Sequence, residues 1–266
     1  MTFEISTALR EGFERTLSRN GLLLIGVFVA FGLANAVVSQ SLSAATVRLV
    51  EQTEPLGPGA GPLTGRAELP FALGVPATLA AALSVLVFVV EEGLRVFSIR
   101  AFASEHTERM PSEFTRRGAR ATAHSVVASV IVAALTVLGL VLLVVPGVYV
   151  ALSFFFVRQE IAVEDKGVVE ALRDSWALTD GDRWELLGLA VLVAVVNLLA
   201  GLPSAAFGFL NPVAGALVAV SVGAVTTVFG VAAATRAYVQ LREERAGNEG
   251  DTRLDDAEEW NDPDGV

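Results

Sequence analysis

Six long apolar stretches with few or no charged residues constrain the fold of this chain more than any other feature. The hydrocarbon core of a bilayer is about 30 Å thick, so a helix needs about 20 apolar residues to cross it. Such segments are helical because lipid offers no partner to an unpaired backbone amide. The sequence therefore predicts an all-α, polytopic membrane protein with six transmembrane helices, at residues 21–38, 71–90, 125–145, 147–163, 186–202 and 212–235.

The basic residues predict how these helices are oriented. Six crossings place successive loops on alternate sides of the membrane. Of the 19 Lys and Arg residues, only Arg48 and Arg66 then lie on one side, and all others lie on the opposite side. Short loops rich in Lys and Arg stay in the cytoplasm. The N and C termini of a cell-membrane protein with this pattern are therefore expected to be cytoplasmic.

The fourth stretch is short for a crossing. Its charge-free part, residues 148–157, extends only about 15 Å as a helix, which is half of the hydrocarbon thickness. Two arrangements agree with the distribution of basic residues. One is a full crossing, and the other is a re-entrant hairpin that enters and leaves from the cytoplasm with Pro146 and Gly147 at its tip. The sequence leaves both open.

Four ionisable residues form a candidate intramembrane polar site. In a full crossing, Arg158 and Glu160 lie within the membrane, where charged groups are costly and suggest a functional site. The alternative is that both side chains snorkel toward cytoplasmic water. Residues two apart point to different helix faces, so Arg158 and Glu160 are poor partners for each other. Glu91 or Glu92, at the cytoplasmic end of the second span, is the predicted partner of Arg158.

The composition resembles that of proteins from halophilic prokaryotes. Acidic residues outnumber basic ones by 29 to 19, Lys166 is the only lysine, and Cys is absent. The charge is uneven, because residues 243–266 carry ten acidic residues and only two arginines. This segment is predicted to be a disordered acidic cytoplasmic tail that follows a six-helix membrane domain at residues 1–242. No nucleic-acid partner is expected.

Two segments that precede membrane hairpins match each other. Residues 8–13 and Thr16 correspond by residue type to residues 171–176 and Thr179, and a fainter match lies at residues 116–122. The pattern predicts an internal repeat of three units, each an amphipathic helix followed by a hairpin. The alternative is convergence, because many interfacial helices carry Ala, Leu and Arg at helical spacing.

An ordered set of residues runs from the second hairpin to the segment before the third hairpin: Pro146, Gly147, Tyr149, Ser175, Trp176 and Gly181. This set resembles the signature of an uncharacterised family of six-helix integral membrane proteins related to the membrane domain of glycerophosphoryl diester phosphodiesterases, here in a halophilic, archaeal-type member. The resemblance implies a membrane module without attached activity, because the phosphodiesterase of the fused relatives is a separate barrel domain. Relatives carry a basic residue or a proline midway through the fourth helix, where this chain has Ser153.

The residues offer no pattern typical of catalysis, metal binding or cofactor binding. The only histidines are His106 and His124, and His106, beside two glutamates, is expected in a solvated loop. In the sixth span, small residues recur every fourth position at Gly215, Ala219, Gly223 and Thr227. This spacing predicts a seam that packs against another helix, so Gly223→Leu is expected to disrupt folding or assembly.

Two functional classes follow from these observations. The favoured one is a non-enzymatic membrane scaffold or partner-binding module, surrounded by membrane lipids and bound to a membrane or cytoplasmic protein. The alternative is a transporter or channel-like protein for a small or lipidic solute. A polar cavity reaching Arg158 favours transport, whereas a dry, packed bundle favours the scaffold. The sequence does not predict the ligand, the partner or the oligomeric state.

Overall fold

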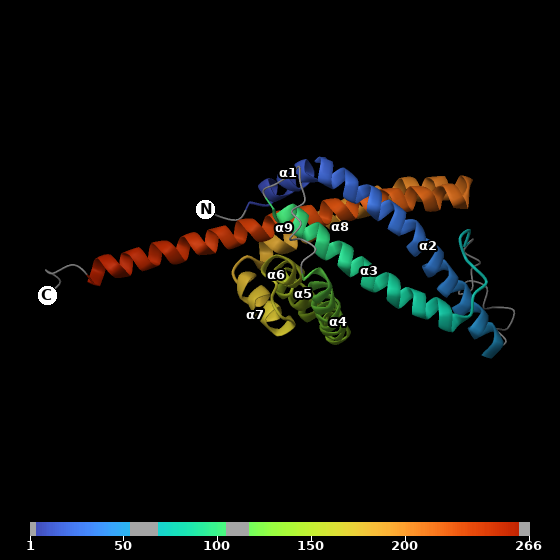
Figure 1. Cartoon of the computed structure of the whole chain (residues 1–266), viewed down its shortest axis with the longest axis horizontal. Coiled ribbons are helices and arrows are strands. Elements are labelled where there is room, and N and C mark those ends of the chain that lie inside the picture. Colours follow the sequence, from blue (N-terminus) through green and yellow to red (C-terminus); the bar gives the residue numbers. More distant parts are fainter. Residues whose placement is uncertain (1–3, 54–68, 105–116, 261–266) are drawn as a thin grey trace.

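The computed structural model describes residues 4–53, 69–104 and 117–260, with side chains described over residues 4–50, 69–104 and 117–247. Regular structure in these segments is entirely α-helical, which confirms the predicted fold class. The helices, coloured along the chain in Figure 1, are α1 (Ile5–Thr16), α2 (Arg19–Thr53), α3 (Ala77–Ala103), α4 (Gly118–Leu142), α5 (Val144–Ser153), α6 (Val157–Glu164), α7 (Val168–Leu178), α8 (Arg183–Leu210) and α9 (Pro212–Trp260). His106 and Arg66 lie outside the described residues.

In the described part of the chain, six stretches of helix are long and apolar enough to cross a membrane, and each overlaps one of the predicted spans. They indicate a multi-pass membrane protein. The second span begins at Ala77 rather than at residue 71, because Pro76 precedes it with an extended backbone (φ −60°, ψ 148°). Proline also disfavours helical conformation in the residue before it, so residues 71–75 are not helical.

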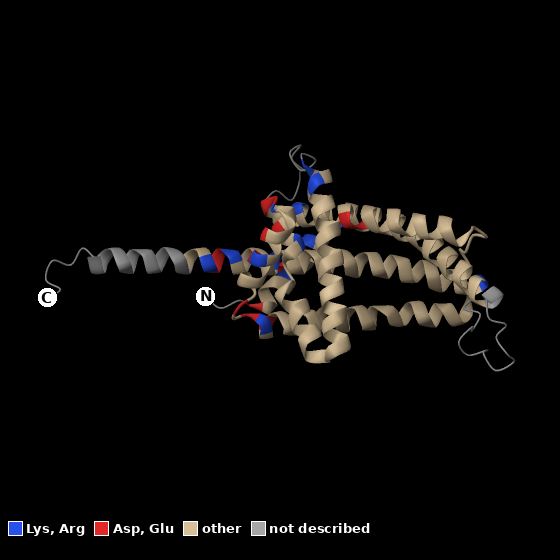
Figure 2. Cartoon of the chain, turned by 90° about the horizontal axis from the view of Figure 1, so that it is seen from below, with Lys and Arg blue, Asp and Glu red and all other residues tan. Residues whose placement is uncertain are grey.

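Seen from below, the helices α2, α3, α8 and α9 run side by side away from the end where most charged residues gather (Figure 2), and in Figure 1 α2 and α3 slope away from α8 and α9. The same end carries α1, α6 and α7 (Figure 1). Helix α9 contacts α1, α2, α3 and α8, so it joins both ends of the chain. Its packed face toward α2 and α3 consists of Ala224, Val228 and Ala232, which are nearly inaccessible to solvent. Small side chains here let the helices approach closely and gain dispersion contacts.

The short helix α1 packs against α9 through small residues. A Cβ added to Gly12 would lie 2.8 Å from the Cα of Ala233, so only glycine fits at this crossing. Nearby, the Nε of Arg236 donates to Glu11 over 2.5 Å. The first and last helices of the chain are therefore joined by both packing and an ion pair.

Corresponding residues of the two matching segments are buried. These are Ala8, Gly12 and Thr16 in α1, and Ala171 and Ser175 in α7 with Thr179 directly after it. The correspondence ends in the spans that follow, where Leu23 is 57% exposed and Leu186 is fully buried. The internal repeat therefore stays a prediction.

The predicted seam on the sixth span is correct at Gly215 and wrong at Gly223. A Cβ on Gly215 would lie 2.5 Å from the Cα of Gly208 on α8, whereas a Cβ on Gly223 would meet nothing within 4 Å. A step of four residues turns about 40° beyond a full helical turn, so a four-residue repeat drifts around the helix. No neighbouring group lies close to Gly223, so the expected effect of Gly223→Leu no longer has a packing basis within the chain.

Helix α9 differs from the expected ending of the membrane domain at residue 242. It continues without a break to Trp260. That residues 243–266 form a separate, disordered acidic tail stays a prediction. Extending an existing helix avoids the cost of nucleation, and this segment is rich in the helix formers Glu, Arg, Ala and Leu. The remaining residues of the predicted tail, 261–266, lie outside the described part of the chain.

Candidate functional site

The fourth span is broken near its charged end. Sequence analysis predicts one helix over residues 147–163, but α5 ends at Ser153 and α6 begins at Val157. The Ser175 hydroxyl donates to the Ser153 carbonyl over 3.1 Å and accepts from the Phe156 amide over 3.2 Å. Thr179 donates to the same carbonyl over 3.3 Å. Because a break inside a membrane protein needs partners for its backbone groups, α7 stabilises this one.

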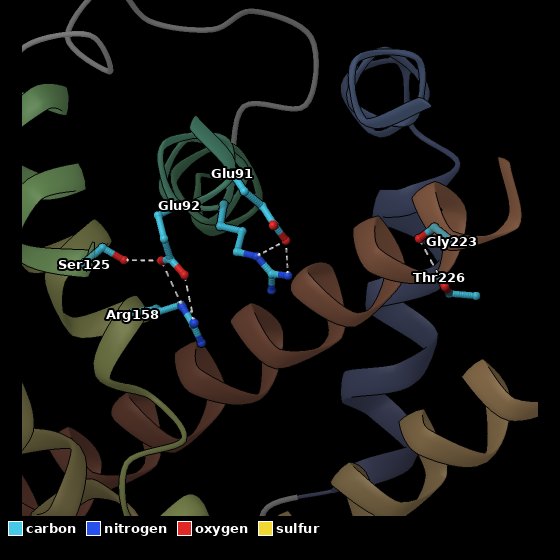
Figure 3. Close-up of polar contacts among 7 residues, drawn as sticks. Glu91, Glu92, Ser125, Arg158, Gly223 and Thr226 are labelled. Carbon is cyan, nitrogen blue, oxygen red and sulfur yellow. Dashed lines mark hydrogen bonds and ion pairs between the residues drawn. The ribbon is translucent and has the colours of Figure 1, made fainter. Parts of the chain in front are cut away.

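Helix α6 places Arg158 against Glu92 of α3, as Figure 3 shows. The Arg158 Nη2 lies 2.9 Å from Glu92 Oε1, and its Nε lies 3.2 Å from Oε2. Ser125 of α4 donates to the same carboxylate over 2.7 Å. The Glu92 side chain is only 3% exposed, whereas that of Arg158 is 41% exposed. The expected pairing of Arg158 with an acid of the second span is therefore observed, with Glu92.

Glu91 lies elsewhere. Its carboxylate accepts from Arg95, one turn later on the same helix, at 2.6 Å, and both side chains are about one-third exposed. One residue along an α-helix is about 100° of rotation, so Glu91 and Glu92 face different neighbours. The structure therefore brings Glu92 and Arg158 together and leaves Glu91 in a local ion pair.

Glu160 has a separate set of partners. Its carboxylate, 3% exposed, lies 2.6 Å from the Lys166 Nζ and 3.7 Å from Arg242 of α9. Lys166 also contacts Asp174 of α7 at 2.7 Å. Burial by itself lowers the pKa of Lys166, but its bonds to Asp174 and Glu160 outweigh burial and raise that pKa above its usual value. Arg242 also pairs with Glu164 at 2.6 Å.

Arg100 of α3 holds the end of α6. Its side chain is 8% exposed, its Nε donates to the Ala162 carbonyl over 2.7 Å, and its Nη2 lies 2.5 Å from Asp165. Asp165 adopts the left-handed conformation (φ 54°) that ends α6. Together, six residues form what we call the α6 cluster: Glu92, Arg100, Arg158, Glu160, Lys166 and Arg242. The sequence did not indicate Arg100, Lys166 or Arg242 as members, since each reads as an ordinary basic residue of a cytoplasmic segment.

The motif aromatics meet at the side of the hairpin. The Tyr149 and Trp176 rings are T-shaped with centroids 5.6 Å apart. The Arg183 guanidinium lies 4.7 Å from the Tyr149 centroid and 5.5 Å from that of Trp176. A cation over aromatic faces is attracted by their quadrupoles, so these residues fasten the start of α8 to α5.

The remaining motif residues shape turns. A Cβ on Gly139 would lie 2.8 Å from the Cα of Gly147, so the two arms of the α4–α5 hairpin touch at these glycines. Pro146 lies beside them at the exposed tip. Gly181 has a φ of +95°, which an L side chain rarely adopts, and it permits the turn from α7 to α8.

Two surface pockets lie away from the α6 cluster. One of about 250 Å³, between α8 and α9, is lined mainly by apolar groups with Asn197 at its wall. The other, of about 720 Å³, is open to the surroundings near the α8–α9 turn. Neither is lined by Arg158 or Glu160. Within the described residues, no three His, Asp or Glu side chains are grouped so as to hold a metal ion.

A family model described as "Domain of unknown function (DUF7847)" matches residues 3–241, which is most of the chain. The chain belongs to the DUF7847 family. The DUF7847 match covers the spans, α6 and α7, and it ends before Arg242 and the long end of α9. It carries no link to the membrane domain of glycerophosphoryl diester phosphodiesterases, so that resemblance stays a prediction. Comparisons with curated proteins and with solved structures found no match.

Proposed function

We propose that this protein is a non-enzymatic membrane module that binds a protein partner with the end of α9. The observation that carries the proposal is the continuous helix Pro212–Trp260, which is a candidate span over its first part and extends well past the other helices (Figure 1). A helix that continues out of a packed bundle presents a preformed surface, so little conformational entropy is lost when a partner binds.

The α6 cluster supports a scaffold more than a transport site. Each of its carboxylates is already paired with a basic side chain, and its members come from α3, α6, α9 and the segment before α7. Buried charges that are mutually paired fix the relative placement of the helices that carry them. The cluster therefore gives α9 a rigid base.

The charge of the α9 end indicates the kind of partner. Residues 243–260 include eight acidic residues and only Arg245 and Arg253 as basic ones. Opposite charge speeds encounter and selects among partners. We infer a basic protein surface on the cytoplasmic side, because the distribution of basic residues predicts a cytoplasmic C terminus.

Cross-linking in native membranes tests the proposal. The full chain is compared with a variant in which Asp255, Asp256, Glu258 and Glu259 are replaced by their amides. The control neutralises three exposed acids elsewhere, at Glu14, Glu170 and Glu185. A protein cross-linked to the full chain and to the control, but not to the tail variant, supports the proposal. A partner that both variants retain contradicts it.

A second measurement addresses the alternative. The purified protein is reconstituted into vesicles, and the flux of ions and small solutes is followed with and without Arg158→Ala. A scaffold gives the flux of empty vesicles in both cases. A flux that requires Arg158 would replace the scaffold with a transporter whose pathway reaches the α6 cluster.

A further inference from the structure

The α4–α5 hairpin is oriented differently from the other apolar helices. In Figure 2 it runs across the direction of α2, α3, α8 and α9, close to the end where the charged residues gather. In Figure 1 the same hairpin is seen nearly end-on below the other helices, so the two views agree. If the four long helices cross the bilayer, this hairpin lies along the membrane plane near one face.

From Ser125 onward, the surface of this hairpin is apolar around its whole circumference. Residues Ser125 through Val157 include no charged side chain. Five consecutive residues at the tip, Val141 to Val145, are 68–77% exposed. Over residues 133–151, all of which are described, the buried ones are Gly139 and Gly147, which touch each other. A helix at a membrane surface has a polar face toward water, and this hairpin has none.

The base of the hairpin is fixed at the charged end. Ser125 of α4 is bonded to Glu92, and the backbone at Ser153 is bonded to Ser175 and Thr179. Helix α5 has ten residues, which is about 15 Å of helix and half of the hydrocarbon thickness. The chain beyond α5 is α6, whose charged side chains are held by the α6 cluster. Both arms therefore begin and end on the same side of the membrane.

We propose that the α4–α5 hairpin is a surface for lipid acyl chains and is embedded in the leaflet at the charged end, without crossing the bilayer. The chain then crosses the membrane with α2, α3, α8 and α9. An all-round apolar surface fits hydrocarbon, and the helical backbone of both arms leaves few polar groups without a partner. The proposal keeps all the basic loops on one side, and it goes beyond the proposed function.

Thiol labelling tests the position of the tip. The chain has no cysteine, so each introduced thiol is the only one. Val144→Cys is compared with Phe209→Cys at the end of α8 and Gly74→Cys before α3, both at exposed positions. Right-side-out and inside-out vesicles are treated with a membrane-impermeant maleimide. The two controls are expected to react from one and the same side. Val144→Cys is expected to stay at the background of the Cys-free chain from both sides, and to react after detergent is added.

A distance measurement completes the test, because the tip of a crossing hairpin could also be shielded by the opposite leaflet. The double variant Val144→Cys and Phe209→Cys is spin-labelled in lipid nanodiscs. In the proposed arrangement the two labels are far apart, because one is near the charged end and the other is at the opposite end of α8. Labels in close proximity, or Val144→Cys reacting from the same side as the controls, would overturn the proposal. Each variant is first checked for monodispersity, so that misfolding is recognised.

Discussion

Removing the partner of a buried carboxylate gives the sharpest test of the α6 cluster. In Arg158→Ala, Glu92 loses an ion pair with two hydrogen bonds, at 2.9 and 3.2 Å, and keeps only the bond from Ser125. The Glu92 side chain is 3% exposed, so its carboxylate depends on protein groups rather than on water for its partners. Arg158→Ala is therefore expected to lower the free energy of unfolding.

The size of this effect follows from the burial of the two side chains. Breaking a buried ion pair by removing one partner costs about 3 to 5 kcal/mol. Because Arg158 itself is 41% exposed, part of its attraction is screened by solvent, and we expect about 3 kcal/mol. The control is Arg95→Ala, which breaks the partly exposed pair with Glu91 and is expected to cost about 0.5 kcal/mol.

The assay is denaturation of the purified protein in one detergent, followed by loss of helical signal. A second substitution adds a signature: Glu92→Leu in the Arg158→Ala background removes the unpaired carboxylate and is expected to recover most of the stability. Likewise, Arg158→Glu is expected to lower membrane-fraction yield, and Glu92→Arg to restore it. Equal losses for Arg158→Ala and Arg95→Ala, or no recovery in either double variant, would refute the reasoning.

Three further predictions concern packing, the helix break and pH. Gly215→Leu forces a side chain against α8, because even a Cβ at this position would lie 2.5 Å from the Cα of Gly208. We expect it to lower the free energy of unfolding in detergent by about 1 to 3 kcal/mol. Gly223→Leu adds a side chain where no atom lies within 4 Å, and it should change the same free energy by less than about 0.5 kcal/mol. Ser175→Ala leaves the Phe156 amide without its acceptor and should cost about 1 to 3 kcal/mol in the same assay, whereas a change near zero would mean that another group stabilises the break. The raised pKa of Lys166 means that its pairs stabilise the fold fully below pH 10.5, and that this contribution disappears as pH rises through the folded-state pKa. An alkaline melting series should therefore show a smaller loss of stability for Lys166→Met than for the unchanged chain.

The spans were predictable because hydrocarbon imposes one strong requirement on the backbone, and hydropathy records it directly. The break between Ser153 and Val157 was not predictable in the same way. The residues that stabilise it, Ser175 and Thr179, lie more than twenty residues after Ser153. In the sequence they correspond to residues of α1, which indicates an internal repeat and not a hydrogen bond to Ser153. The available signal was that Ser175 of the short helix α7 and Thr179 directly after it are polar residues on the same face, where they need a hydrogen-bond partner once they are buried.

The candidate site was predictable only in outline. Positive charge in the fourth span and acids at the end of the second indicated a pair, but choosing between Glu91 and Glu92 requires the rotation of α3 about its axis. That rotation depends on tertiary packing, as does the difference between Gly215, which packs against α8, and Gly223, which meets nothing within 4 Å. The continuation of α9 through residues 243–260 was not predictable, because composition describes an isolated segment and not one that extends an existing helix.

The contact between Gly12 and Ala233 has a consequence for how the protein is made. A ribosome delivers α1 first and α9 last, so the small-residue face of α1 has no helix to cover it until nearly the whole chain has been synthesised. Membrane insertion of α2 and α3 therefore precedes the closure of the N-terminal helix onto its final neighbour. Nascent chains that stop before Ala233 therefore lack this contact.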